Sequence, residues 1–159
     1  MTIQEYKKKF QQLRTTISDE VERIIYANEE DICLMNIQKI DYHIGSDGQA
    51  LKNTNKKYSG VYQPMTVNIS KMEGSLLPKV LGQPYNWMWT GQFIGGFKLK
   101  VIKNSTQIEI YSTGEGSGLK KSFFDGYKNL YGLTLEDQKI LNQSIIKPEL
   151  EKFIKQYLS

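Results

Sequence analysis

The stretch FKLKVIKNSTQIEIY, residues 97–111, decides the fold. Apolar and polar residues alternate on both sides of a Lys-Asn-Ser turn at residues 103–105, which is the pattern of two half-buried strands joined in a hairpin. On its outer face Lys98 and Lys100 would lie near Glu109, where a cross-strand pair contributes only about 0.2–1 kcal/mol. The sequence therefore predicts a small antiparallel sheet with a hairpin near residues 97–111.

Helical patterns lie on both sides of this hairpin. At the N-terminus Thr2 and Glu5 form a capping-box pattern, and apolar residues then recur at spacings of three and four. Ser18 is a candidate cap for a second helix that runs to about Asp41. At the other end Thr134 caps a helix that Pro148 would end or kink, and a terminal amphipathic stripe follows: Leu150, Phe153, Ile154, Tyr157 and Leu158.

The middle of the chain is less regular. Residues 45–48, Gly-Ser-Asp-Gly, are typical of a turn, and the alternation of residues 65–70 predicts a further strand. Trp87 and Trp89 flank Met88, so in a strand both indoles would lie on one face. That face either packs beneath the N-terminal helix or anchors a neighbouring subunit.

The length and composition fit one domain. The chain has 159 residues, 39% of them hydrophobic and 24% charged, with a net charge of +4. We expect a single α+β domain over residues 1–159, with a helical part at about 2–41, a sheet part at about 60–112 and C-terminal helices at about 134–158. The single cysteine excludes an internal disulfide. Neither a membrane-spanning run nor a signal-peptide pattern is present, so we expect a protein of the cytosolic type without a membrane partner.

The positive charge is concentrated in one window. Residues 50–103 contain eight lysines and one glutamate, a net charge of +7, whereas the rest of the chain sums to −3. The window is either a solvated lysine-rich face or a surface for nucleic acid or an acidic partner. Lys98, Lys100 and Lys103 of the hairpin are the first candidates for such contacts.

Few residues are suited to catalysis or metal binding. His43 is the only histidine, and Cys33 lies ten residues away, roughly three helical turns, so the two would not touch within one helix. The glycines at 114, 116 and 118 precede Lys120, but the phosphate-loop pattern is not met because Leu119 intervenes. We therefore expect no enzymatic activity, no metal site and no cofactor.

Four segments carry a resemblance to a known family. In order they are Ile44-Gly45-Ser46-Asp47-Gly48, Trp89-Thr90-Gly91-Gln92-Phe93, Ile108-Glu109-Ile110-Tyr111-Ser112 and Leu130-Tyr131-Gly132-Leu133-Thr134. With the flanking helices, they resemble the tail-completion or head–tail joining (virion morphogenesis) proteins of tailed bacteriophages, especially those of Bacteroidales gut phages. The chain departs from that pattern at Phe93 and Gly95-Gly96, where Leu/Ser is frequent, and at Lys128-Asn129, which replaces a frequent Pro-Arg.

The resemblance implies a structural virion protein without an active site. Such a subunit forms or completes a ring, of 6 or 12 copies, at the head–tail connector or tail end. It binds neighbouring connector, portal and tail proteins and leaves a lumen through which DNA passes. The protein would be assembled in the host cytoplasm and reside in the virion. Lys98, Lys100 and Lys103 would then line the lumen or face a partner, and candidate subunit contacts are Trp87, Trp89, Phe153 and Tyr157. The alternative function is a small basic nucleic-acid-binding protein.

Overall fold

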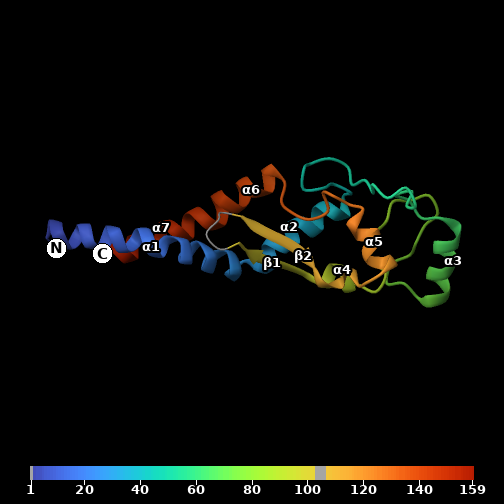
Figure 1. Cartoon of the computed structure of the whole chain (residues 1–159), viewed down its shortest axis with the longest axis horizontal. Helices are drawn as coiled ribbons and strands as arrows, with labels where there is room; N and C mark the ends of the chain where they lie inside the picture. The colour runs from blue at the N-terminus through green and yellow to red at the C-terminus, as the bar shows by residue number, and fades with distance from the viewer. Residues whose placement is uncertain (1, 103–106) are drawn as a thin grey trace.

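The protein is elongated, and both chain termini lie near one end of it (Figure 1). The computed structural model describes residues 2–102 and 107–159. Before the hairpin the chain forms the helices α1 (Ile3–Ala27), α2 (Glu29–Asp41), α3 (Pro64–Glu73) and the short α4 (Gln92–Gly95). The strands β1 (Phe97–Val101) and β2 (Ile108–Ser112) follow, with a short 3₁₀ turn, η1 (Thr113–Glu115). The helix α5 (Leu119–Asp125) leads to a helical C-terminus made of α6 (Leu135–Leu141), the π-helical η2 (Asn142–Ile146) and α7 (Lys147–Leu158).

The predicted α+β class and the hairpin are confirmed. β1 and β2 pair antiparallel, with Leu99 opposite Ile110 on the buried face and Lys100 opposite Glu109 on the outer face. The predicted turn at 103–105 lies outside the described residues. The other edge of β1 is covered by helix side chains, since Glu29 Oε1 accepts a hydrogen bond from Leu99 N at 3.1 Å and Tyr26 Oη accepts one from Val101 N at 3.2 Å. These contacts fix the sheet against the junction of α1 and α2.

The N-terminal helix is longer than predicted. The capping box forms as expected, because Thr2 Oγ1 accepts from Glu5 N and the Glu5 carboxylate accepts from Thr2 N. The helix then runs without a break through Ser18, so the prediction of a second helix capped there is wrong. The interruption comes at Asn28, whose Nδ2 donates to Ile24 O at 2.8 Å.

Two further local predictions are corrected. Residues 65–70 are not a strand but the middle of α3, which has Pro64 in its first turn and the left-handed Gly74 after its last. Pro148 does not end the C-terminal helix: the chain stays helical from Leu135 to Leu158, and η2 ends at Ile146, two residues before the proline. A π-helical stretch shifts the hydrogen-bonding register, which accommodates a residue without an N–H group.

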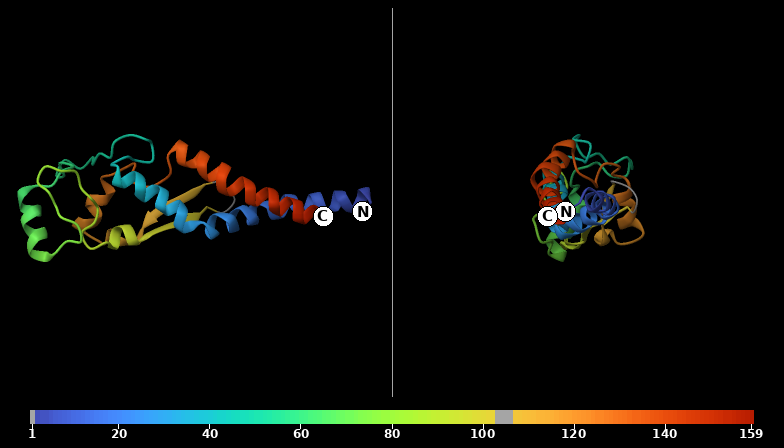
Figure 2. Two further views of the ribbon diagram at one scale, coloured as in Figure 1. Left: turned by 180° about the vertical axis from the view of Figure 1, so that it is seen from behind. Right: turned by 90° about the vertical axis from the view of Figure 1, so that its left-hand side faces the viewer.

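The buried core lies at the middle of the molecule. α2 and the inner face of the hairpin enclose it together with the aromatic residues of α4, α5 and the segment around Trp87. α1 and α7 lie side by side between this core and the end that carries both termini (Figure 2). α1 runs toward the core and α7 runs away from it, so the two helices are antiparallel. We call this antiparallel helix pair the stalk. α3 lies at the opposite end of the molecule.

Candidate functional site

The hairpin lysines lie on the outer face of the sheet. Lys98 and Lys100 are exposed and point away from the core, as the alternation predicted. Lys98 is opposite Tyr111 and Lys100 is opposite Glu109. The third candidate, Lys103, lies outside the described residues. The two described lysines therefore offer positive charge to a partner, partly offset by Glu109.

The basic window does not form one surface. Lys71 is on α3 at the far end of the molecule, well away from the hairpin. Lys79 is buried, with 4% of its surface exposed. Its ammonium group donates to Asn86 Oδ1 at 2.5 Å and to Met88 O at 2.8 Å, and lies 5.7 Å from the centroid of the Trp89 ring. Burial lowers the pKa of Lys79. Lys79 therefore links its own loop to residues 86–88 through hydrogen bonds, and it is not available to nucleic acid.

Trp87 belongs to the core, and its assignment as a subunit contact is wrong. Its backbone has φ of +59°, so the strand that was to place both indoles on one face does not form. The indole is buried among aromatic rings, with centroids 4.9 Å from Tyr127 and 5.7 Å from both Phe93 and Phe123. Trp89 is half-buried beside Lys79.

Phe153 and Tyr157 lie in the stalk. Both side chains are half-buried, and their ring centroids are 5.7 Å apart. α1 continues beyond the C-terminal end of α7, so its first turns project alone (Figures 1 and 2). On those turns Ile3, Tyr6 and Phe10 are 86%, 44% and 55% exposed. The stalk therefore presents apolar side chains that the chain itself covers only in part.

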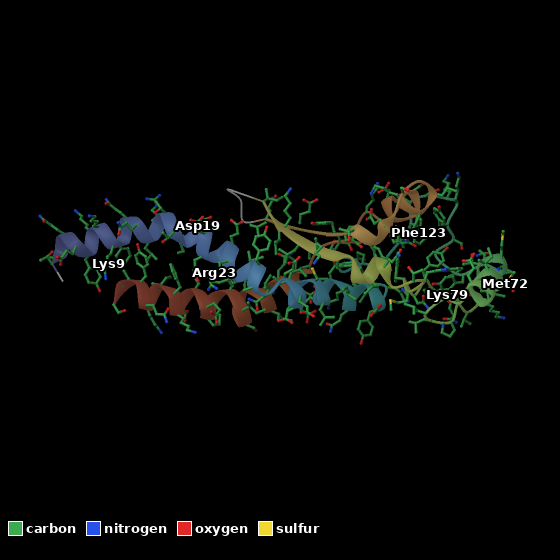
Figure 3. The ribbon with its side chains drawn as sticks, turned by 90° about the horizontal axis from the view of Figure 1, so that it is seen from below. Lys9, Asp19, Arg23, Met72, Lys79 and Phe123 are labelled. Carbon is green, nitrogen blue, oxygen red and sulfur yellow. The ribbon has the colours of Figure 1, made fainter. Side chains whose placement is uncertain are left out.

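The opposite end of the molecule is also apolar, which the sequence did not indicate. Figure 3 shows Met72 at this end and Lys9 toward the free end of the stalk. The exposed apolar side chains come from α3 and the loop after it: Met65, Met72, Leu76, Leu77, Val80 and Leu81. The predicted strand at 65–70 placed Met65 on a buried face, and the other five residues lie beyond that strand in segments to which the sequence assigned no apolar surface.

A groove of about 1040 Å³ lies between the base of the stalk and the hairpin. One wall is the second half of α1, another is the end of the hairpin, and the third is the run from α6 to α7. Apolar side chains from all three walls line it: Ile17, Val21, Ile102, Ile108, Ile146 and Leu150. Because these residues come from three distant segments, no single stretch of sequence indicates the groove.

The four segments that carry the family resemblance form two contacting pairs. Ser46 N donates to Asn129 O at 2.8 Å, and Gly132 lies against the Ser46 side chain, so the turn at 45–48 meets the segment before α6. Ser112 Oγ donates to Phe93 O at 2.6 Å, which joins β2 to α4. The segments thus hold the ends of the hairpin and of α2 in place.

The groups considered for chemistry are held in structural positions. Cys33 is buried, and burial raises the pKa of its thiol to about 11. His43 has φ of +58° just after the end of α2, and its backbone N–H donates a hydrogen bond to Ile40 O. Across residues 2–102 and 107–159, no group of three or more His, Cys, Asp or Glu side chains is arranged to hold a metal ion. In the same residues, no helix combines the length and the apolar character that crossing a membrane requires.

The arrangement is suited to non-covalent association. Its exposed apolar surfaces lie at both ends and in the groove, and its exposed strand lysines lie between them. Comparisons of the chain with known protein families, with curated proteins and with solved structures give no match.

Proposed function

We propose that this chain is a structural subunit that assembles with copies of itself, forming or completing a ring at the head–tail connector or tail end of a tailed bacteriophage. Its partners would be the neighbouring connector, portal and tail proteins, and its place would be the virion, after assembly in the host cytoplasm. The four segments described above are what suggest this class of protein. A ring lumen would let DNA pass.

The observation that carries the proposal is the partly covered stalk. An antiparallel pair of helices buries only the sides that face each other, and here Tyr6 and Phe10 remain about half exposed while Phe153 and Tyr157 are half-buried. Large apolar patches on soluble proteins mark interaction surfaces. Further copies packed around the stalk would remove these side chains from water, at roughly 25 cal/mol for each Å² of apolar surface buried.

The shape supports assembly with more than one kind of partner. The stalk end and the α3 end are both apolar, and they lie at opposite ends of an elongated molecule. A ring subunit between a head and a tail needs contacts on two opposite sides as well as contacts to its own copies. Lys98 and Lys100, between the two ends, would then face the lumen or an acidic neighbour.

Three measurements test the proposal. Native mass spectrometry of the purified chain is expected to show a discrete oligomer, and electron microscopy is expected to show a ring. Proteomics of purified particles from a phage that encodes the chain is expected to detect it at a fixed copy number. A strict monomer that is absent from particles would overturn the proposal.

The second candidate function is nucleic-acid binding, favoured by Lys98 and Lys100 on one exposed strand face. Each phosphate neutralised adds about 0.9 to the slope of log affinity against log salt, so these two lysines would contribute a slope of about 1.8. Tight DNA binding by the isolated chain, with a steeper slope that Lys98→Ala and Lys100→Ala reduce, would favour this candidate. Weak binding that appears only in the oligomer would favour the ring.

A further inference from the structure

The groove at the base of the stalk is acidic as well as apolar. Besides the apolar side chains, its walls include Glu22 on α1 and Glu109 on β2, the second of which is opposite Lys100 in the hairpin. Among the lining residues, all of which belong to the described part of the chain, there is no lysine, arginine or histidine. A segment that fills this groove needs apolar side chains on one face and positive charge beside them.

The projecting end of α1 has this character. Ile3, Tyr6 and Phe10 lie on one face of the helix at the spacings i, i+3 and i+7, and the rings of Tyr6 and Phe10 stack with centroids 6.5 Å apart. Lys7 and Lys9 flank this face, whereas Lys8 lies on the opposite side of the helix, and Glu5 is the single acid of residues 2–10. We call residues 3–10 the tip. The tip is apolar and basic, and the groove is apolar and acidic.

The tip and the groove of one chain are separated along α1. The groove is lined by residues 17–25 of α1, whereas the tip is residues 3–10 of the same straight helix. At 1.5 Å per residue, about 14 residues of helix place the two roughly 20 Å apart. The tip of one copy therefore cannot fill its own groove, but a second copy can supply one.

We propose that the tip of each copy docks in the groove of the next, with Tyr6 and Phe10 against the apolar walls and Lys7 and Lys9 near Glu22 and Glu109. This inference rests on the proposed ring function and names the contact that builds the ring. Tip and groove are different surfaces, so the contact is of the head-to-tail type, which closes into a ring when the rotation between copies allows it. The charge pairs at the edge of the contact make its formation rate depend on salt.

A pair of variants tests the contact. Tyr6→Glu with Phe10→Glu changes exposed tip residues and is expected to convert the oligomer into a monomer by native mass spectrometry, while circular dichroism still shows a folded helical chain. Gln4→Glu with Gln11→Glu adds the same charge on exposed positions of the same turns and is the matched control, which is expected to remain oligomeric. Ile102→Glu in the groove is expected to give a monomer as well. Mixing the tip variant with the groove variant is expected to give complexes of two chains and no larger, because one intact tip and one intact groove remain.

Disulfide trapping gives a second readout that does not depend on loss of assembly. A tagged chain with Phe10→Cys is mixed with an untagged chain with Ile102→Cys and oxidised. A disulfide between the two chains is expected. In the control, the untagged chain carries Tyr42→Cys instead of Ile102→Cys. Tyr42 is exposed and away from the groove, so no disulfide is expected. The native Cys33 is buried and does not compete.

The outcomes separate this inference from the proposed function. If the tip variant and the groove variant assemble as the unmodified chain does, the contact is wrong and the ring function stands. If the unmodified chain stops at a dimer yet the two cysteine variants form the disulfide, the contact is supported and the ring function fails. If the unmodified chain is a monomer at all concentrations and the cysteine variants form no disulfide, both fail.

Discussion

Asn36 on α2 donates a hydrogen bond from its Nδ2 to the carbonyl of Leu130, 94 residues further along the chain, at 3.1 Å. Its Oδ1 accepts a second hydrogen bond from Gly132 N, also at 3.1 Å. The Asn36 side chain is fully buried. Its one amide group provides hydrogen-bond partners for two backbone groups of the segment before α6, which water would otherwise provide. This link holds the segment before α6 against α2.

Replacing Asn36 with alanine is expected to destabilise the protein strongly. The change leaves the buried Leu130 O and the partly buried Gly132 N without these partners, and an unsatisfied buried group costs about 1–3 kcal/mol. We expect a loss of about 3 kcal/mol in the free energy of unfolding, measured by urea denaturation. Asn68→Ala, on an exposed position of α3, is the matched control and is expected to change it by less than about 0.5 kcal/mol. Equal effects of the two changes would contradict the role of Asn36.

Gly114→Ala is expected to disturb the joint between the hairpin and α4. A Cβ atom at Gly114 would lie 1.9 Å from Gln92 O and 2.7 Å from Phe93 Cα, both of which are backbone atoms that cannot move aside cheaply. We expect a loss of at least about 2 kcal/mol in unfolding free energy. Gly95→Ala is the control, because a Cβ there meets nothing within 4 Å. The thermal midpoint of Gly95→Ala should match or exceed that of the unmodified protein, while that of Gly114→Ala falls.

The parts of the fold that follow from local rules could be predicted from the sequence. The hairpin, the capping box at Thr2 and the cap at Thr134 were correct because each depends on residues within a few positions of one another. α3 was missed although the sequence marks it, with proline in the first turn and glycine after the last. The alternation of residues 65–70 was given more weight than these boundary signals. A segment this short can fit both the two-residue period of a strand and the 3.6-residue period of a helix.

The rest of the structure depends on contacts between distant segments. The break at Asn28 has no glycine or proline to mark it, and it is placed where Glu29 and Tyr26 meet the edge of β1. For the candidate site, the stripe that contains Phe153 and Tyr157 was readable as an amphipathic helix. The sequence left open whether Trp87 is buried, and it did not indicate the burial of Lys79, because the contacts of both residues depend on an irregular chain path that no periodicity describes.

Cys33 makes the stability of the protein depend on alkaline pH. Burial raises the pKa of its thiol from 9.0 to about 11, so between these values the folded state holds a proton that the unfolded state releases. The stabilising contribution is complete below pH 9 and is lost as the pH rises toward 11. The difference in unfolding free energy between the unmodified protein and Cys33→Ala is therefore expected to shrink from pH 8.5 to pH 11. A difference that stays constant or grows would show that the thiol ionises as readily in the folded state as in the unfolded chain.

Leu13 is expected to hold α7 on α1. Its side chain is buried although the neighbouring turns of α1 are exposed, and α7 is the element that lies alongside this part of the helix. Leu13→Ala removes apolar contact and is expected to weaken the stalk by about 2–3 kcal/mol, which speeds hydrogen exchange through local opening about a hundredfold.

The expected change is confined to one part of the chain. Exchange of the α7 amides should accelerate in Leu13→Ala, while exchange in β1 and β2 stays as in the unmodified protein, because the core does not include the stalk end. The exposed Gln11→Ala is the control and should leave both regions unchanged. The measurement is made on the monomeric Tyr6→Glu, Phe10→Glu background, so that packing between copies does not protect α7. If α7 exchanges at the same rate with and without Leu13, the stalk does not depend on this contact and α7 must be held from the η2 side alone.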